Sequence, residues 1–402
     1  MALGRRQIIA GLGAIVSHEA NSASMPWISP DLPDGTRGEA HLAQIPNKSP
    51  LIQLSDSPPN LESPIQSFRT AITPGDQFYV RYHLAGVPDA DSLDKWALEI
   101  GGDAAERSVR LTAVDLHDLP QSEIAAVCQC AGNRRGLLQS HVPGVQWGHG
   151  AMGCAIWHGP RLRDVLKRAG VKPEAREIWL SGADTPVLPG TPKFQKCLPL
   201  DKAMADETII ATSMNGAPLP LLNGFPARVV VPGWLSTYWM KHLTHIEISA
   251  KPLDGFWMRG AYRVPSGIYP VSQPFTTQNN NNTWPVTEIP VNALIADPVH
   301  GDEVERSGFT VHGVAWDKGS GILRVDVSLD GGATWQSALL DSEVGVYAFR
   351  TFRLETGSLP RGRTELRVRA VSNGRESQPD AWRANPGGYY NNMPQRLTVE
   401  VV

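Results

Sequence analysis

The sequence changes its character near residue 290, and no other feature limits the possible folds as much. Beyond that point, short apolar segments alternate in the manner of strands, and turn signals such as Asp330-Gly331-Gly332 separate them. The strand candidates are residues 291–296, 308–316, 323–329, 347–354, 364–372 and 395–402. None of these segments has the apolar spacing of a helix. Closely spaced short strands of this kind predict an all-β, immunoglobulin-like sandwich over residues 291–402.

Before this change, strand candidates are mixed with short helices. The strand candidates are residues 78–83, 96–100, 124–130, 177–180, 227–231 and 245–249. The helix candidates are residues 112–116, 161–169 and 200–205. Thr112 can cap the first helix candidate. Apolar side chains of the second helix candidate share one face, and Gly170 can end that helix. Because strands and helices do not alternate regularly, and because 38 Gly and 33 Pro favour loops, we expect an α+β domain.

The chain is expected to divide into five parts. They are a signal segment (1–24), an extended N-terminal arm rich in Pro, Ser and Asp (25–64), a mixed α+β domain (65–255), an irregular connection (256–290) and the sandwich domain (291–402). The connection is predicted from its prolines, its glycines and its run of asparagines. A chain of 402 residues is long enough for two domains with cores of their own.

The N-terminus resembles an export signal. Arg5-Arg6 precedes the apolar run 8–16, and small residues follow at 20–23. This order resembles a twin-arginine signal, which implies export of the folded protein to the periplasm. The alternative is a chance pair of arginines before a buried helix. The apolar run is shorter than the roughly 20 residues that cross a bilayer, so we expect no membrane span.

The overall charge argues against nucleic acid as a partner. Lys and Arg total 37 and Asp and Glu total 40, so the formal net charge is −3. A chain without a basic excess lacks the electrostatic footprint of a nucleic-acid-binding protein. Any site for an anion must therefore come from local clusters of Arg and Lys.

The segment Cys128–Gly136, with the sequence CQCAGNRRG, carries the sharpest chemical signal. It places two thiols at the end of a strand candidate beside two guanidinium groups, which favour a thiolate and attract an anion. A thiolate is also a soft ligand for a metal. From the residues alone, three interpretations stay open: one metal-bound thiolate, a two-cysteine metal clip, or a buried strand with inert thiols. The clip lacks further ligands nearby, and four cysteines are too few for a disulfide scaffold.

The run Cys130–Arg135 resembles the molybdenum-binding signature of the sulfite oxidase family. This resemblance implies that Cys130 is the only protein ligand of the molybdenum, beside the dithiolene of one molybdopterin. It leaves Cys128 as a strand residue that faces the same side. The resemblance extends over residues 65–402, and it implies a molybdopterin-binding catalytic domain followed by a dimerisation domain.

Further matches in the same order imply which residues hold the cofactor. The expected cofactor-binding residues are Tyr79, Val80, Arg81, Tyr82, His83, Cys130, Asp184, Asn223, Arg228, Trp239, Met240 and Lys241. Arg228 is expected at the phosphate of the pterin, because a guanidinium can clamp a phosphate with two hydrogen bonds, and Lys241 is a second cation. The family usually has His at the position of Asn223, so one possible positive charge is missing there.

The resemblance also implies a substrate pocket. The expected catalytic residues are Arg81, Arg135, Tyr262 and Arg396. The arginines would bind an anion, and the tyrosine would donate to the reacting oxygens. Arg383 competes with Arg396 for the C-terminal position. Trp147 resembles an aromatic residue of the pocket wall, whereas the Lys that animal members carry shortly before it is replaced near Pro143-Gly144.

Together these matches imply an oxidoreductase that converts sulfite to sulfate and passes electrons singly to an external c-type cytochrome. The segment 238–242 is most similar to catalytic subunits of bacterial sulfite dehydrogenases. The sequence contains no Cys-x-x-Cys-His haem motif, no cytochrome b5-like segment and no flavin domain, so we expect no haem or flavin on this chain. The expected assembly is a homodimer or a heterodimer with a haem subunit.

Three other functions stay open at this point. A sulfane-sulfur dehydrogenase of a thiosulfate-oxidising system and a sulfoxide reductase would both keep the molybdenum centre. Sulfoxide reductases of this superfamily usually lack the sandwich domain, which argues against them. A non-enzymatic binding protein is the third alternative, and the joint presence of Cys130, Arg81, Tyr262 and Arg228 argues against it.

Overall fold

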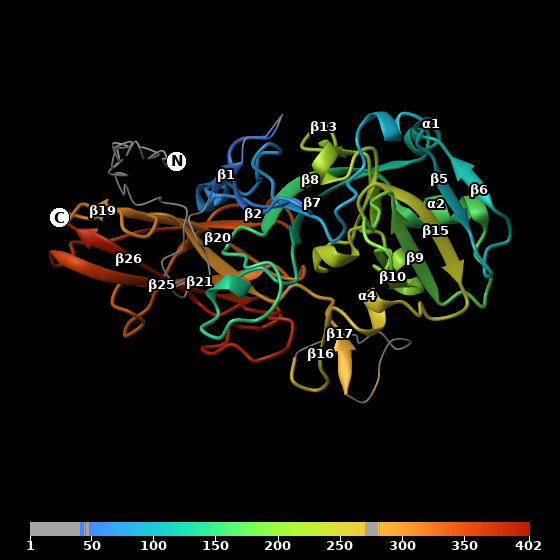
Figure 1. Cartoon of the computed structure of the whole chain (residues 1–402). Coiled ribbons are helices and arrows are strands. Elements are labelled where there is room, and N and C mark those ends of the chain that lie inside the picture. Colours follow the sequence, from blue (N-terminus) through green and yellow to red (C-terminus); the bar gives the residue numbers. More distant parts are fainter. Residues whose placement is uncertain (1–40, 44, 46–47, 270–279, 281) are drawn as a thin grey trace, which may run out of the picture.

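The computed structural model describes residues 41–43, 45, 48–269, 280 and 282–402. A mixed domain of small sheets and short helices is followed by a β-sandwich (Figure 1). The predicted α+β domain and the predicted sandwich are both confirmed. The predicted signal segment and residues 25–40 of the predicted arm lie outside the described residues.

A four-stranded antiparallel sheet begins the described chain. Its strands, in order, are β1 (His41–Ala43), β2 (Leu51–Ser55), β3 (Asn60–Glu62) and β4 (Val80–Arg81). The prediction of an extended arm is wrong for β2 and β3, because these strands fold back and pair in the same sheet as β4. Leu51, Leu61 and Val80 form a small core on this sheet. The sheet thereby fixes Arg81, which ends β4.

A five-stranded sheet forms the end of the mixed domain that lies away from the sandwich (Figure 1). Its order is β10 (Gln195–Pro199), β9 (Glu177–Gly182), β15 (Leu243–Ser249), β5 (Leu98–Gly101) and β6 (Val109–Leu111). β15 runs parallel to β5, and the other neighbours are antiparallel.

Three short helices belong to the same domain. They are α1 (Ala113–His117), α2 (Leu162–Ala169) and α3 (Leu200–Met204). The Thr112 hydroxyl accepts a hydrogen bond from the backbone N–H of Asp115 and so caps α1. Gly170 ends α2 with a φ of 72°, a value that favours glycine. These two helix ends confirm the sequence prediction.

A second four-stranded sheet leads from the mixed domain to the sandwich. Its order is β13 (Ala217–Pro218), β12 (Ser213–Met214), β8 (Met152–Pro160) and β7 (Gln121–Gln129). A separate antiparallel pair consists of β11 (Ile209–Ala211) and β14 (Arg228–Val230). Short 3-10 helices are η1 (Ile65–Phe68), η2 (Asp91–Leu93), η3 (Arg135–Leu137), η4 (Leu221–Asn223) and η5 (Ser236–Tyr238). β7 therefore ends next to Cys130, and β14 begins with Arg228. The sequence assigned both residues to the site.

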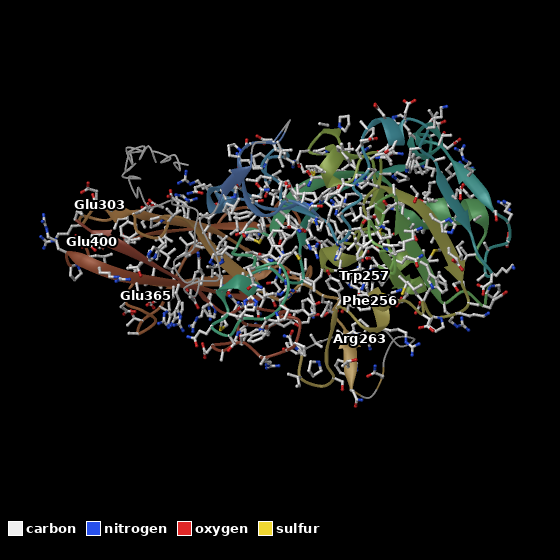
Figure 2. The ribbon with its side chains drawn as sticks, viewed as in Figure 1. Phe256, Trp257, Arg263, Glu303, Glu365 and Glu400 are labelled. Carbon is white, nitrogen blue, oxygen red and sulfur yellow. The ribbon has the colours of Figure 1, made fainter. Side chains whose placement is uncertain are left out.

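The C-terminal sandwich consists of two sheets. One has the order β18 (Asn292–Asp297), β20 (Thr310–Trp316), β24 (Arg350–Glu355) and β23 (Leu339–Leu340). The other has the order β19 (Glu303–Val304), β26 (Gln395–Val401), β25 (Gly362–Ser372), β21 (Ile322–Ser328) and β22 (Gln336–Ser337). Their inward side chains form one apolar core. Glu303, Glu365 and Glu400 mark the end of the sandwich that points away from the mixed domain (Figure 2).

The predicted irregular connection contains some regular structure. It includes α4 (Phe256–Arg259) and an antiparallel pair of β16 (Arg263–Pro265) with β17 (Thr283–Pro285). The residues between these two strands lie outside the description apart from 266–269, 280 and 282. No helix in the described part of the chain is long and apolar enough to cross a membrane.

One apolar cluster spans both domains. It joins side chains such as Val127 of β7 to Leu294 of β18. Trp316 belongs to this cluster, and its indole N–H donates to Gln129 Oε1 at 2.6 Å. Because Gln129 directly precedes Cys130, the sandwich helps to fix the strand end that carries this cysteine.

Candidate functional site

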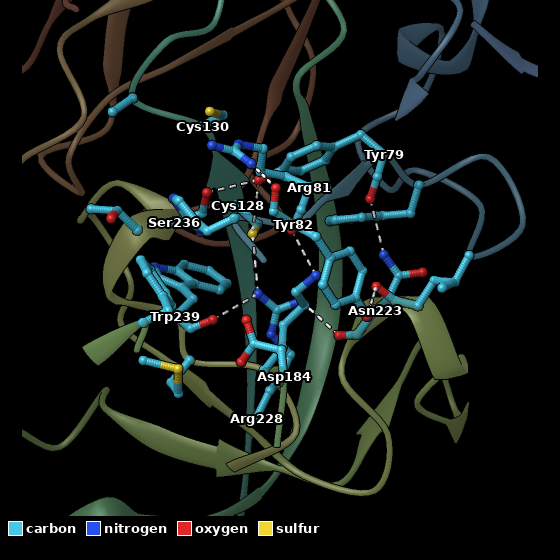
Figure 3. A pocket seen from close by; sticks show the side chains of 18 of the residues that line it. Tyr79, Arg81, Tyr82, Cys128, Cys130, Asp184, Asn223, Arg228, Ser236 and Trp239 are labelled. Carbon is cyan, nitrogen blue, oxygen red and sulfur yellow. Dashed lines mark hydrogen bonds between the residues drawn. The ribbon is translucent and has the colours of Figure 1, made fainter. Parts of the chain in front are cut away.

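A cavity lies in the mixed domain (Figure 3). The sequence-predicted residues that line it are Tyr79, Arg81, Tyr82, His83, Cys130, Asp184, Asn223, Arg228, Trp239, Met240, Lys241 and Tyr262. Cys130 lies at one end of the view, Arg228 and Asp184 lie at the other, and Cys128 lies between them. We call the part around Cys130, Arg81, His83 and Tyr262 the thiol end. We call the part around Arg228, Lys241, Asn223 and Asp184 the cation end.

Cys130 lies directly after β7, where the strand turns into a tight loop. Its backbone N–H donates to the carbonyl of Ala151 at 2.9 Å, and its own carbonyl accepts from the N–H of Asn133 at 3.0 Å. The side chain is buried and lines the cavity. These bonds hold the thiol in one position at the thiol end.

Cys128 also lines the cavity, which confirms that the two thiols share one side of the strand. Its Sγ lies 3.4 Å from Tyr79 Oη and 3.6 Å from Arg228 Nη2. Burial raises the pKa of the Cys128 thiol, although the Arg228 charge opposes this shift. All four cysteines are buried and free. Cys128 is therefore a neutral thiol in the wall between the two ends.

Asn133 and Arg134 hold the loop that follows Cys130. Asn133 Oδ1 accepts from the N–H of Ala151 at 3.0 Å. Arg134 has a φ of 68°, and its Nη1 donates to Asn292 Oδ1 at 3.0 Å and to the carbonyl of Met393 at 2.7 Å. These residues of the signature therefore tie the Cys130 loop to the sandwich domain.

Arg135 does not line the cavity, which corrects its prediction as a catalytic anion ligand. Its Nε and Nη2 donate to the carbonyl of Gly387 at 2.9 and 2.7 Å, and its Nη1 donates to the carbonyl of Val145 at 3.0 Å. The guanidinium also lies 5.6 Å from the ring centroid of Tyr389. Its donors are directed at backbone carbonyls, so the residue joins the loop to the C-terminal segment.

Arg396 is not in the cavity either. It is exposed on β26, where it lies opposite Arg367 of β25. The competing Arg383 is also exposed, and it donates to the carbonyl of Ile268. The prediction that a C-terminal arginine enters the pocket is therefore wrong for both candidates. Tyr389 is the residue of this segment that reaches the thiol end.

Val80 and Trp147 face away from the cavity. Because successive residues of a strand point to opposite sides, Val80 packs into the small core of the first sheet while Arg81 faces the cavity. The Trp147 ring is fully buried and meets the Tyr79 ring edge to face at 6.4 Å between centroids. Val80 is therefore corrected from a cofactor contact to a core residue, and Trp147 supports the wall from behind.

Arg228 is the central residue of the cation end. Its Nη1 donates to the carbonyl of Asn223 at 2.9 Å, and its Nη2 donates to the carbonyl of Trp239 at 3.3 Å. The Arg228 side chain is buried, and its Nε has no hydrogen-bond partner among the described residues. The guanidinium lies over the Trp157 ring, 5.0 Å from its centroid. A buried, incompletely satisfied cation of this kind suits an anionic ligand.

Asn223 is held in one orientation by two neighbours. Its Oδ1 accepts from Lys48 Nζ at 2.5 Å, and its Nδ2 donates to the carbonyl of Tyr79 at 3.0 Å. Burial lowers the pKa of Lys48 to about 7, with a smaller opposing effect from Asp76. Lys48 thus brings a titratable positive charge to the place where the sequence had suggested that one was missing.

Lys241 is a second cation at the cation end. Its Nζ donates to the carbonyl of Arg81 at 2.7 Å and lies 2.9 Å from the ring centroid of Tyr82. Burial, followed by the charge of Arg228, lowers the pKa of Lys241 well below its ordinary value. Burial raises the pKa of the nearby Asp184, and the charge of Lys241 opposes that shift.

A neutral histidine supports this end from behind the cavity wall. His242 Nδ1 donates to the carbonyl of Phe225 at 2.6 Å, which leaves Nε2 to accept from Tyr82 Oη at 2.6 Å. Burial, followed by the Lys241 charge, lowers the pKa of His242 to about 3. The ring therefore stays uncharged at neutral pH and fixes Tyr82.

Tyr262 and His83 form the wall of the thiol end. Tyr262 has a φ of 58°, and its hydroxyl is hydrogen-bonded to His83 Nε2. Burial raises the pKa of the Tyr262 phenol, whereas the charge of Arg81 lowers it. Burial and the charge of Arg81 lower the pKa of His83 well below its ordinary value. A protonated phenol and a neutral imidazole therefore lie beside the cationic Arg81.

The sequence did not identify several residues around the thiol end. Phe194 stacks on His83 with 3.8 Å between ring centroids, and Tyr389 stacks on Tyr262 at 5.5 Å. Thr237 lines the cavity, and its buried hydroxyl has no described partner. Tyr389 belongs to the C-terminal segment that was expected to supply an arginine, and the adjacent tyrosines Tyr389 and Tyr390 were the signal there. Phe194 and Thr237 have no such signal.

Glu62 is another residue without a sequence signal. It is buried on β3, and its carboxylate accepts from the N–H groups of Gly148 and Gly150 at 2.8 and 2.9 Å. Charge-assisted bonds of this kind are stronger than neutral ones. The first sheet therefore fixes the segment that leads back to β8 beside Cys130.

The residues fit the molybdopterin cofactor that the signature implies. Among the described residues, no three His, Cys, Asp or Glu side chains gather to hold a metal. A metal at Cys130 would therefore need other ligands, which the dithiolene of a pterin supplies. The cation end offers Arg228 and Lys241 against one carboxylate, Asp184. The buried Nε of Arg228 is available for a phosphate.

Comparisons with known proteins match both domains of the chain. Residues 83–257 match the family described as oxidoreductase molybdopterin binding domain, and residues 283–402 match the Mo-co oxidoreductase dimerisation domain. Human mitochondrial sulfite oxidase is 36% identical over 379 residues, covering 89% of this chain and 67% of that protein. Sulfite oxidase of Arabidopsis thaliana is 31% identical over 325 residues, covering 77% of this chain and 81% of that protein.

A solved structure is also similar in its fold. The sulfane dehydrogenase SoxCD from Paracoccus pantotrophus superposes with a TM-score of 0.72 and 26% sequence identity. The match covers 87% of this chain and 88% of that chain. Both the mixed domain and the sandwich therefore have counterparts in proteins of known structure.

Proposed function

The chain belongs to the sulfite oxidase family of molybdenum oxidoreductases, and from this premise we propose that it oxidises sulfite to sulfate. One observation carries the proposal. A buried thiol, Cys130, lies in the same cavity as the cation Arg81 and the phenol Tyr262, while a second set of cations lies at the other end. This arrangement provides for one metal-bound sulfur, one oxyanion and one phosphate in a single cavity.

Each residue of the thiol end has a separate task in the proposed reaction. Arg81 binds the oxygens of sulfite, because a guanidinium pairs well with a planar or pyramidal oxyanion. Tyr262 donates a hydrogen bond from its protonated hydroxyl, and His83 holds that hydroxyl in place. The rings of Phe194 and Tyr389 restrict water around the pair.

Cys130 would hold the molybdenum, and the cation end would hold the pterin. Arg228 and Lys241 would bind the pterin phosphate, and Asn223 and Asp184 would bind its polar groups. When bound, the molybdenum supplies oxygen-atom transfer and takes up two electrons. The protein groups orient the substrate and balance its charge.

We further propose that electrons pass singly to an external c-type cytochrome and that the protein is exported to the periplasm. The proposal of export is based on Arg5-Arg6 and the apolar run after it. The dimerisation domain over residues 283–402 supports an assembly of two chains, and a heterodimer with a haem subunit is the alternative. The proposal places no haem or flavin on this chain.

The direct test is a sulfite assay on purified protein of known molybdenum content. We expect about one molybdenum per chain and sulfite-dependent reduction of ferricyanide and of cytochrome c. Protein that contains stoichiometric molybdenum but reduces neither acceptor with sulfite would contradict the proposal. Elemental analysis alone separates an enzyme from a non-enzymatic binding protein, which would retain no molybdenum.

Sulfane-sulfur oxidation is the second candidate. Two observations favour it: Arg135 and Arg396 do not supply the cations expected at the thiol end, and the fold is similar to a sulfane dehydrogenase. A less strongly cationic pocket suits a substrate with less charge than sulfite. Turnover with a protein-bound persulfide and none with sulfite would favour this candidate, whereas reduction of a sulfoxide would favour a sulfoxide reductase.

A further inference from the structure

Lys196 is a fully buried cation close to the thiol end, although it does not line the cavity. It belongs to β10, and its Nζ donates to the carbonyl of Trp257 at 2.7 Å. The same Nζ lies 5.0 Å from the ring centroid of Tyr262 and 4.6 Å from that of Tyr238. Two aromatic rings and one carbonyl therefore surround the ammonium group.

This environment contains no counter-ion. Within the part of the chain that the structure describes, no carboxylate pairs with Lys196. Removing an ammonium group from water without an ion pair is energetically costly, even after local relaxation. Contacts with aromatic faces offset only part of this cost. A methionine or leucine would fill the same space without the cost of desolvating a charge. Packing alone therefore does not explain why a lysine occupies this position.

The contact with Tyr262 links this charge to the site. A cation on a ring face withdraws electron density from the phenol, so its hydroxyl becomes a stronger hydrogen-bond donor. Tyr262 is bonded to His83, and the charge of Lys196 also contributes to lowering the pKa of His83. Trp257, whose carbonyl receives the Lys196 bond, meets the His83 ring at 5.1 Å. Trp257 and Arg263, both labelled in Figure 2, belong to the connection.

We propose that Lys196 is a positioning residue that acts through Tyr262 to strengthen binding of a sulfur oxyanion at the thiol end. It supplies from behind the wall a positive charge that Arg135 and Arg396 do not supply from within the cavity. This inference is based on the proposed function, because it requires an anion beside Tyr262. The charge does not touch the substrate, so Lys196 is not itself a catalytic residue.

The role of Lys196 should depend on pH. Burial lowers the pKa of Lys196 to about 7, and Cys197 and Arg263 are the charged or titratable neighbours that modify it. The other groups facing it are Tyr238 and Tyr262, whose pKa values are raised by burial, and His83, whose pKa is lowered by burial. These three stay neutral at neutral pH. Raising the pH through about 7 therefore removes the charge of Lys196.

Sulfate is the suitable probe, because it stays divalent throughout this pH range and it is the product of the proposed reaction. We would measure its dissociation constant by calorimetry at about pH 6 and about pH 9. The proteins are the wild-type chain, Lys196→Met, Lys196→Arg and the exposed control Lys251→Met. Lys48 and Lys241 also have lowered pKa values, so the comparison with Lys196→Met isolates the contribution of Lys196.

At about pH 6 we expect Lys196→Met to bind sulfate about fivefold to tenfold more weakly than the wild type, which is roughly the contribution of one typical hydrogen bond, because the Tyr262 hydroxyl becomes a weaker donor. At about pH 9 the two should bind equally. Lys196→Arg should bind sulfate as tightly as the wild type at about pH 6 and more tightly than the wild type at about pH 9, because a guanidinium keeps its charge. Lys251→Met should match the wild type at both pH values. Equal binding by wild type and Lys196→Met at both pH values would overturn the inference.

Tyr262→Phe tests whether Lys196 acts through the hydroxyl. In this background, Lys196→Met should change sulfate binding by less than about twofold, because coupled residues are not additive. A full fivefold loss in the double variant would overturn the route through Tyr262. If Lys196→Met does not fold, Tyr262→Phe should show a smaller change in sulfate affinity between about pH 6 and about pH 9 than the wild type, with the contribution of Lys48 remaining. An unchanged difference between the two pH values would overturn the route through Tyr262.

The proposed function and the role of Lys196 fail in different ways. A protein loaded with molybdenum that does not oxidise sulfite contradicts the proposed function. A protein that oxidises sulfite, and whose sulfate affinity does not change with Lys196→Met, contradicts only the role of Lys196.

Discussion

The two ends of the cavity hold their positive charges in different ways. At the cation end, Arg228 and Lys241 face the cavity, and the Nε of Arg228 stays without a partner among the described residues. At the thiol end, Arg81 faces the cavity, whereas Arg135 is directed at two backbone carbonyls. Under the proposed function, the cation end binds a fixed anionic group. The thiol end keeps one direct cation beside neutral hydrogen-bonding groups.

This difference suits the different lifetimes of the two ligands. A cofactor that stays bound benefits from several buried charges, because their desolvation is offset once by lasting ion pairs. A substrate that must leave as product after each turnover benefits from fewer charges and from groups such as Tyr262 and His83 that stay neutral. The predictions below test this contrast, beginning with the largest expected effect.

Arg228→Met should have the largest effect on the cofactor. It removes a buried guanidinium that has a free donor, so we expect roughly a hundredfold loss in affinity for molybdopterin, about 3 kcal/mol. The measurement is the pterin and molybdenum content of purified protein after dialysis. The exposed Arg168→Met is the matched control and should retain both. Full retention of pterin and molybdenum by Arg228→Met would contradict the assignment of the cation end to the cofactor.

His242 should make the cation end sensitive to acid. Its pKa in the folded protein is about 3, below the ordinary value of 6.5, because of burial first and the Lys241 charge second. The unfolded chain therefore binds a proton before the folded chain does, and stability falls as the pH drops through this window. Between about pH 6.5 and about pH 4 the loss should be about 3 kcal/mol.

Chemical denaturation of the wild type and of His242→Gln over this pH range measures the effect. The variant should lose the steep part of the pH dependence, whereas the exposed His117→Gln should keep it. A pH profile of His242→Gln that is parallel to the wild type would show that the ring is not the group responsible.

Arg135→Met should affect stability and leave substrate binding almost unchanged. The variant loses three hydrogen bonds to Gly387 and Val145 carbonyls, so we expect about 2 kcal/mol of destabilisation. The KM for sulfite should change by less than about threefold. A KM raised by more than about tenfold, without a change in stability, would return Arg135 to the thiol end as an anion ligand.

Arg396→Ala should have the smallest effect. The residue is exposed on β26 and far from the cavity wall, so stability should stay within about 0.5 kcal/mol of the wild type. Steady-state kinetics with sulfite should be unchanged. A clear loss of sulfite affinity would show that this arginine reaches the thiol end after all.

The fold was predictable where local pattern decides it. Alternating apolar residues identified the sandwich strands, and Thr112 and Gly170 marked two helix ends. The strands β2 and β3 were missed because their short, proline-flanked sequence lacks a clear alternation. Their pairing with β4 depends on contacts that a local pattern does not contain.

The sequence predicted correctly those site residues whose side chains suit a single chemical role, such as a metal-binding thiol or a phosphate-binding guanidinium. Cys130, Arg228 and Tyr262 line the cavity as predicted. Arg135 was misplaced because its partner Gly387 is 252 positions away and contributes only a carbonyl, which carries no sequence signal. Lys196 was missed because nothing in the sequence distinguishes a buried lysine from an exposed one on a strand. Ordered matches locate a segment, and the folded structure decides which side chains face the cavity.

Cys130 is the residue on which the proposed function depends most directly. The decisive measurement is sulfite turnover by Cys130→Ser in protein that still contains molybdenum and pterin. We expect turnover to fall at least about a thousandfold, because the thiolate ligand of the metal is lost, while circular dichroism shows an intact fold. Full sulfite oxidation by molybdenum-containing Cys130→Ser would contradict the assignment of Cys130 as the metal ligand.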